Sequence, residues 1–344
     1  MTLDPRLVHA ELTRRGFLWS YGLLAGYQVN LRAREHMTLK AEQDWRSTAR
    51  KLVETPEDPW LLRRLHLEQL DLLLRICMYL EDFAYLVHLL QHRPRSMHLA
   101  IHFSGQTRAS AIGTLRHMPL PSLRALFGVP HYTKLGLPSQ HLRTVKEVFG
   151  KYVAGLRQDA DRVVQFHRQH YFDVYNEYKH SFDVFIGMQG QTSGSGSSHI
   201  YLRVPKEVRR KGKKRKSYRQ WTYILDTGPE AVSYYMRVFG SISNLAWSLV
   251  LNNLDHMLYA DGRYLIKIPK AYGVSGDLLR EYEELIPAHG LCWSKSHQLN
   301  LNLHFAGREA DRLQADLQES FVAVLRRPLL SSRSGKITTD LKAQ

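Results

Sequence analysis

The feature that most constrains the fold is a long stripe of apolar residues at helical spacing, which follows Asp58-Pro59 and continues to Gln91. Apolar residues that recur every three or four positions form the buried face of an α-helix. Asp is a favoured N-cap and Pro a favoured first helical residue, so the helix is expected to begin at Pro59. Gln69 is a polar interruption of the stripe. The apolar members are Leu61, Leu65, Leu72, Leu73, Ile76, Leu80, Phe83, Leu86 and Leu89.

Other periodic segments predict further helices and a few strands. The Pro- and Gly-punctuated segment 92–138 predicts irregular structure with a short helix near 122–127. Helical patterns cover residues 7–27, 139–180 (with a kink allowed), 231–258 and 308–326. Runs typical of β-strands cover residues 199–204, 221–225, 264–268 and 297–305.

These patterns predict a mainly α chain, in which a helical region precedes a smaller α+β region with a basic β-hairpin. Residues 187–198 are rich in Gly, Ser, Thr and Gln, a composition typical of flexible linkers, and we place the domain boundary there. The helical region then covers residues 1–186 and the α+β region residues 199–330. Residues 331–344 are expected to form a flexible polar tail.

Composition excludes several classes of protein. The two cysteines, Cys77 and Cys292, cannot form a disulfide framework or a Cys-rich zinc site. No run of about eighteen apolar residues indicates a membrane-spanning helix, and the N-terminus lacks a secretory pattern. No Gly-rich phosphate loop and no His-Glu-x-x-His helix occurs, so neither a cofactor nor a metal is expected. We therefore expect an intracellular protein of the cytoplasm, although Lys213-Lys214-Arg215-Lys216 is equally compatible with nuclear import.

Positive charge is concentrated in one short segment. The chain carries 48 Lys and Arg against 32 Asp and Glu, a net charge of 48 − 32 = +16. Residues 201–220 hold ten basic residues and one acid, so they contribute +9. Cations at this density repel one another unless a polyanion neutralises them, which favours a polyanion partner, such as a nucleic acid, over a solvated loop that protects the hairpin from aggregation. The candidate nucleic-acid-binding residues are Lys206, Arg209, Arg210, Lys211, Lys213, Lys214, Arg215, Lys216 and Arg219.

Three aromatic residues, Tyr201, Tyr218 and Trp221, flank the basic segment. Aromatic side chains stack on unpaired bases, but in strands they more often pack in a core. Both interpretations stay open on sequence alone.

A second candidate site lies at the end of the helix predicted to reach His180. At helical spacing Asn176, Lys179 and His180 share one face, and Arg168 lies two turns earlier on a similar side. Histidine can act as a general base near neutral pH, and a neighbouring cation can stabilise charge that develops on phosphate. Such a group could cleave RNA without a metal, with the ribose 2′-hydroxyl as nucleophile. The alternative is a polar helix end in which Lys and His complement the helix dipole.

The stretch from Tyr175 to His180, together with its helical context over about residues 59–183, resembles the signature of HEPN-domain proteins. This helical family is rich in endoribonucleases of toxin and defence systems. Its signature is Arg-Asn followed by three residues and His. Asn176 and His180 match that signature, whereas Tyr175 stands where the family has arginine.

The resemblance leaves Lys179 and Arg168 as candidates for the missing cation, and Glu81 or Asp82 as the acid that orients the site. It also implies a homodimer in which the helices over residues 140–180 pair to build one cleft.

Two hypotheses of function follow. The first is an RNA-binding, HEPN-like protein that acts as a metal-independent endoribonuclease of a toxin or defence type, with His180 as general base and Asn176 orienting the phosphate. The second is a non-catalytic scaffold for nucleic-acid binding or dimerisation, which the replacement of the family arginine by Tyr175 favours.

Overall fold

The structure is a computed structural model, and it describes residues 5–91, 105–169, 171–180, 185–189, 199–208, 217–258, 264–266, 272–288 and 292–293. Internal contacts divide the chain into two units. One comprises Leu23–Lys295, and the other comprises Met1–Gly22 with Ser296–Gln344. The core, the sheets and the candidate site belong to the first unit.

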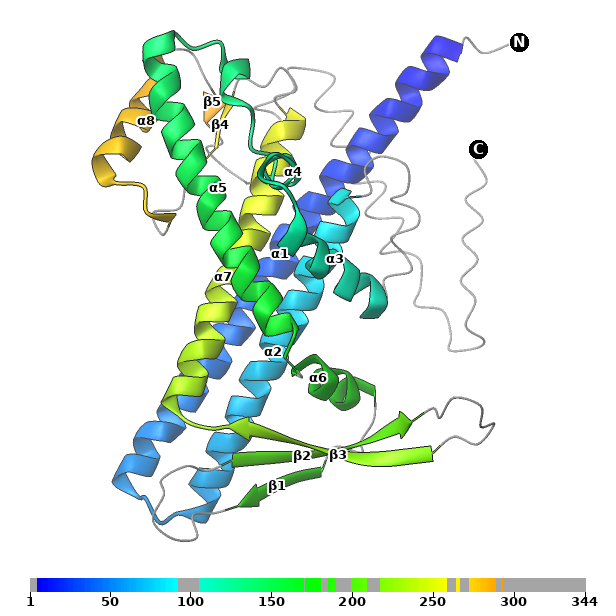
Figure 1. Cartoon of the computed structure of the whole chain (residues 1–344), viewed down its shortest axis with the longest axis vertical. Helices are drawn as coiled ribbons and strands as arrows, with labels where there is room; N and C mark the ends of the chain where they lie inside the picture. The colour runs from blue at the N-terminus through cyan, green and yellow to red at the C-terminus, as the bar shows by residue number, and fades with distance from the viewer. Residues whose placement is uncertain are drawn as a thin grey trace. The chain divides into compact units, whose positions relative to one another are not determined.

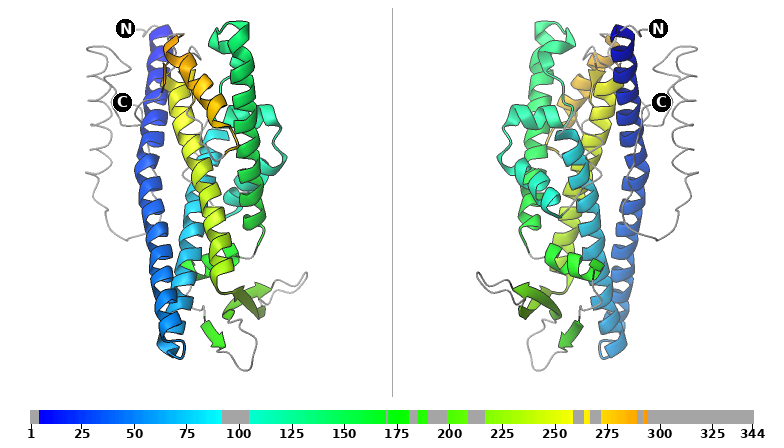
Figure 2. Two further views of the ribbon diagram at one scale, coloured as in Figure 1. Left: turned by 90° about the vertical axis from the view of Figure 1, so that its left-hand side faces the viewer. Right: turned by 90° about the vertical axis from the view of Figure 1, so that its right-hand side faces the viewer.

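Helices dominate the described residues, so the prediction of a mainly α chain is confirmed. The main helices run alongside one another, and a small sheet lies beyond one end of α5 and α7, beside the first part of α2 (Figures 1 and 2). The helices are α1 (Pro5–Glu54), α2 (Pro59–Gln91), α3 (Gly105–His117), α4 (Leu120–Leu126), the 3-10 turn η2 (Tyr132–Leu135), α5 (Ser139–His167), α6 (Tyr171–His180), α7 (Pro229–Leu258) and α8 (Gly276–Ala288). No helix among the described residues is both long enough and apolar enough to span a bilayer.

The helix expected from Pro59 to Gln91 is α2, and its first turn is capped as the sequence predicts. The Asp58 carboxylate accepts hydrogen bonds from the backbone N–H groups of Trp60 (2.8 Å) and Leu61 (3.2 Å). The apolar stripe of α2 is buried from Leu72 onwards, whereas Leu61 and Leu65 are partly exposed, and the helix packs against α7 and α3. Because α7 also packs against α5, helices from both sides of the expected linker share one core.

The long helix expected over residues 139–180 is divided in two. α5 ends at His167, α6 begins at Tyr171, and the ring of Tyr171 stacks on Phe166 with centroids 4.9 Å apart. The break turns α6 towards the sheet (Figure 1). Two helices, α3 and α8, lie where the sequence predicted no helix.

The three-stranded sheet has the order β1-β2-β3, formed by β1 (Phe185–Gln189), β2 (His199–Val208) and β3 (Ser217–Asp226). Both pairings are antiparallel, and β2 pairs with β3 from His199↔Asp226 to Val208↔Ser217. Residues 187–189, which composition assigned to a linker, belong to β1, where Gly187 is opposite Tyr201. Residues 190–198 and the expected basic tip, 209–216, lie outside the described residues.

A parallel pair of short strands, β4 (Tyr264–Leu265) and β5 (Cys292–Trp293), forms the second sheet. β4 covers the beginning of the strand expected over 264–268. The strand expected over 297–305, the helix over 308–326 and the tail over 331–344 lie outside the described residues.

Candidate functional site

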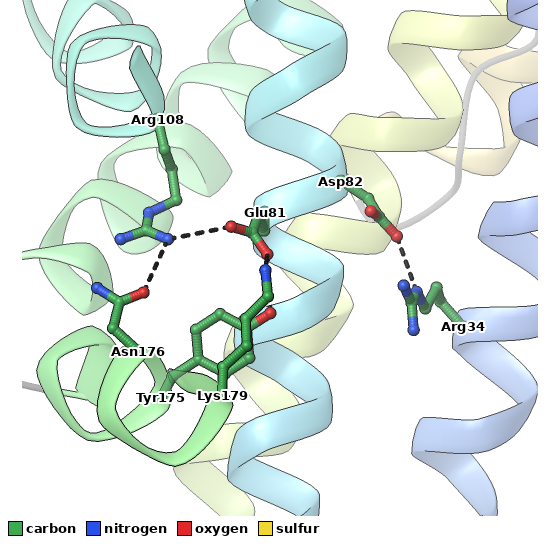
Figure 3. A network of polar contacts seen from close by, with 7 residues as sticks. All are labelled: Arg34, Glu81, Asp82, Arg108, Tyr175, Asn176 and Lys179. Atoms are coloured by element: carbon green, nitrogen blue, oxygen red, sulfur yellow. Dashed lines mark hydrogen bonds and ion pairs between the residues drawn. The ribbon is translucent and has the colours of Figure 1, made fainter. Parts of the chain in front are cut away.

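The carboxylate of Glu81, on α2, is the centre of a polar cluster that joins three helices (Figure 3). Its Oε2 accepts a hydrogen bond of 2.7 Å from the hydroxyl of Tyr175 and one of 3.1 Å from the ammonium of Lys179, both on α6. Its Oε1 lies 3.4 Å from Nη1 of Arg108, on α3. Three donors therefore share one carboxylate, which fixes α6 and α3 against α2.

Arg108 is a buried cation of this cluster, because only 4% of the residue is exposed. Its guanidinium carbon lies 4.2 Å from the centre of the Phe172 ring, and its Nη1 lies 3.5 Å from Oδ1 of Asn176. The buried Nε has no hydrogen-bond partner in the structure. Sequence analysis missed Arg108, because it lies in a segment that the Pro and Gly content made look irregular.

The cluster shifts the ionisation of its members in ways that follow from burial and charge. Burial alone raises the pKa of Glu81, but the hydrogen bonds from Tyr175 and Lys179 and the charges of Lys179 and Arg108 outweigh it, so the net pKa falls. Burial and the bond to Glu81 raise the pKa of the Tyr175 phenol. Burial, assisted by the charge of Arg108, lowers the pKa of nearby His167 to about 4, which keeps that imidazole neutral. The Glu81 carboxylate is thus stabilised as an anion beside a Tyr175 phenol that keeps its proton.

The structure separates the two acids that were candidates for orienting the site. Glu81 lies against α6, whereas Asp82 turns to α1, where its Oδ2 accepts a 2.8 Å bond from Nε of Arg34 (Figure 3). Burial raises the pKa of Asp82, and the bond to Arg34 opposes that rise. Only Glu81 of the two joins the cluster that holds Asn176.

The four expected catalytic residues are only partly brought together. Asn176 and Lys179 lie in the Glu81 cluster, on one face of α6 (Figure 3). Arg168 is exposed and forms the C-cap of α5, before α6 begins. His180 is the last residue of α6, and its side chain lies outside the described part of the structure.

The base of the β2–β3 ribbon is attached to the helices through polar groups. Gln69, the polar interruption of the α2 stripe, is buried, donates a 2.8 Å bond to the carbonyl of Asp226 and accepts a 3.1 Å bond from the N–H of Gly228. The hydroxyl of Tyr223 donates a 3.2 Å bond to Asp173 of α6. The same short helix therefore contacts both the Glu81 cluster and the ribbon.

The nine expected nucleic-acid-binding residues belong to this ribbon and its tip. Lys206 of β2 pairs with Arg219 of β3. The other seven cations lie between Val208 and Ser217 and outside the described residues; they are Arg209, Arg210, Lys211, Lys213, Lys214, Arg215 and Lys216.

Within the described part of the chain, no three His, Cys, Asp or Glu side chains gather in a way that could hold a metal ion. Comparison with known proteins found no matching family model, no matching curated protein and no matching solved structure.

Proposed function

We propose that the protein binds nucleic acid, RNA foremost, through the cations of residues 206–219. The observation that supports this most is the register of the ribbon, in which Val208 lies opposite Ser217. Seven cations stand between these two residues in the sequence, so the segment that carries them is joined to the ribbon at one end only. Their mutual repulsion is relieved when phosphates replace the surrounding counterions, and the release of those counterions favours binding.

The role proposed for the α6 cluster is to stabilise the base of the ribbon rather than to cut the bound strand. Lys179 and Asn176 are both engaged inside the protein, with Glu81 and Arg108 as partners. The phenol of Tyr175, which stands where the family has arginine, is neutral and donates to the same carboxylate. These side chains are held by internal partners, so the non-catalytic hypothesis has the better support.

The test compares two variants with the same change in net charge. The tip variant replaces five cations of residues 211–216 with glutamine, and the control variant replaces five exposed cations on α1, η2 and α5. Fluorescence anisotropy with labelled single-stranded RNA should show a large loss of affinity for the tip variant alone. Equal losses of affinity in the two variants would show that binding depends on net charge alone, and would refute the assignment to residues 206–219. The control positions are Arg50, Lys51, Lys134, Arg143 and Lys146.

A second candidate function, metal-independent RNA cleavage, is favoured by one observation. Arg108 Nη1 lies 3.5 Å from the amide oxygen of Asn176, so a guanidinium stands beside the residue that matches the family asparagine. In this alternative Asn176 orients the phosphate and His180 acts as general base. Incubation with RNA in EDTA would then give 2′,3′-cyclic phosphate ends, and His180→Ala would abolish them. Products that persist in His180→Ala, or that never form, would eliminate this mechanism.

The homodimer belongs to the same alternative, because the family resemblance places one cleft between two copies. Light scattering of the purified chain measures its mass directly. A monomer that still yields cyclic phosphate ends would contradict the composite cleft.

A further inference from the structure

One side of α2 carries large apolar side chains that are exposed. Trp60 is 72% exposed, and Leu67, two helical turns later, is 45% exposed. Arg63 and Arg64 lie between them and are exposed as well, and an exposed Asp71 follows one turn after Leu67. Residues at these spacings share one side of an α-helix. We call this side, from Trp60 to Asp71, the outer face of α2.

The outer face has a cation near one end and a carboxylate near the other. The guanidinium carbon of Arg63 lies 5.4 Å from the centre of the Trp60 ring, and Arg63 has no ion-pair partner within the part of the chain that the structure describes. The Asp71 side chain is 51% exposed, and it accepts a 2.7 Å hydrogen bond from Nε of Arg75. A carboxylate has about four acceptor positions, so Asp71 can bind a second cation.

The spacing of these charges makes the outer face complementary to itself. Arg63 stands four residues before Leu67, and Asp71 stands four residues after it. When two copies of α2 lie antiparallel with Leu67 against Leu67, each Arg63 therefore meets Asp71 of the other copy. A two-fold contact requires such a patch, because the same surface serves both copies. Arg64 does not oppose this pairing, since the carboxylate of Glu68, 2.7 Å away, neutralises it within its own helix.

We propose that the outer face of α2 binds a second copy of this chain, with the two α2 helices antiparallel. Tryptophan and arginine are among the side chains that most often dominate the energy of protein interfaces, and Trp60 and Arg63 provide one of each. Covering Trp60 removes a large apolar surface from water, which stabilises the contact. The two Arg63–Asp71 pairs fix the register of the helices.

This contact is small, and it differs from the cleft that the family resemblance implies. One helix face per copy makes an interface of the weak class, so we expect a dissociation constant in the micromolar range. The cleft would pair the helices over residues 140–180, whereas this contact uses residues 60–71. It goes beyond the proposed function, because nucleic-acid binding by residues 206–219 does not require it.

Two single variants test the contact by charge reversal. In a dimer of Arg63→Glu, carboxylates face each other in both pairs, and in a dimer of Asp71→Arg, guanidinium groups do. Each variant alone should therefore self-associate at least about tenfold more weakly than the unmodified protein. An equimolar mixture of the two variants should associate again, because a mixed dimer has opposite charges in both pairs. Sedimentation equilibrium measures the association, and circular dichroism checks that each variant is folded.

Controls on another helix separate the contact from a general effect of charge. Arg280→Glu and Asp277→Arg make the same changes at a pair on α8 whose side chains are 70% and 89% exposed, and they should leave self-association unchanged. Trp60→Ala changes no charge and should also weaken self-association by at least about tenfold. Unchanged association of Trp60→Ala would contradict a role for the ring.

The expected result is a dimer for the unmodified protein, monomers for each reversed variant alone and dimers in their mixture. An unmodified protein that stays monomeric up to several hundred micromolar would overturn the contact. A dimer that persists in both variants would overturn it too, as would a mixture of the two folded variants that fails to associate. None of these outcomes bears on RNA binding by residues 206–219, which anisotropy measures separately.

Discussion

Substitution of Glu81 by glutamine should destabilise the fold more than the corresponding change at the neighbouring Asp82. Glu81→Gln leaves the Arg108 guanidinium, whose side chain is 5% exposed, without its carboxylate. Removing one partner of a fully buried pair costs about 3–5 kcal/mol. The Glu81 side chain is 24% exposed and that of Lys179 is 46% exposed, so solvent compensates part of the loss and we expect about 2–3 kcal/mol.

Asp82→Asn is the matched comparison, because it removes the same charge from the next residue of the same helix. Its partner is Arg34, and the side chains of Arg34 and Asp82 are 32% and 27% exposed, so the loss should be about 1 kcal/mol or less. Urea denaturation measures both free energies of unfolding. The double variant Glu81→Gln/Arg108→Met should be less destabilised than the sum of its two single variants, since the buried guanidinium is then absent as well. A Glu81→Gln variant no less stable than Asp82→Asn would refute this account of the cluster.

Three further outcomes are expected. The pKa of His167 is about 4 in the folded chain and 6.5 in the free side chain, so the unfolded state takes up the proton first as pH falls. The free energy of unfolding should therefore fall by up to about 3 kcal/mol between about pH 6.5 and pH 4, and His167→Gln should remove that slope in urea titrations at different pH values. Gly155→Ala should destabilise the protein by about 1–3 kcal/mol, because the new Cβ would lie 1.8 Å from Cδ1 of Tyr272. Gly150→Ala, on the same helix and with nothing within 4 Å of the new Cβ, should stabilise the protein by about 0.5–1 kcal/mol. Equal effects of the two variants in urea denaturation would contradict the close approach of Tyr272 to Gly155. Gln69→Leu removes two hydrogen bonds between the buried side chain and the backbone at the ribbon base, and it should cost about 2 kcal/mol. Amide exchange at the start of α7 should become faster, and unchanged exchange there would refute the anchor.

The helices that the sequence predicted well are those whose apolar residues face one core throughout. The stripe of α2 and the Asp58 cap are local signals, so they identified both the helix and its first residue. α3 was missed because Gly105 and Gly113 and the surrounding prolines conceal it, and its stability comes from packing on α2 and α5. Such packing depends on residues far apart in the sequence and leaves no periodic signal.

The candidate site was predictable only in part, for the same reason. Helical spacing identified Asn176 and Lys179 as neighbours, and a single helix is sufficient for that inference. Arg108 comes from another helix, 68 residues away from Asn176, and no local pattern links the two. Glu81 and Asp82 are adjacent in sequence, and only the packing of α1 and α6 on opposite sides of α2 distinguishes them (Figure 3).

The most direct test of nucleic-acid binding by the ribbon tip is the salt dependence of RNA affinity. The logarithm of the association constant should fall linearly with the logarithm of salt concentration. Neutralising five cations of residues 211–216 should reduce the slope by about 0.7 for each phosphate that the protein no longer neutralises. Parallel lines for the unmodified and neutralised proteins would contradict the claim that these cations meet phosphates.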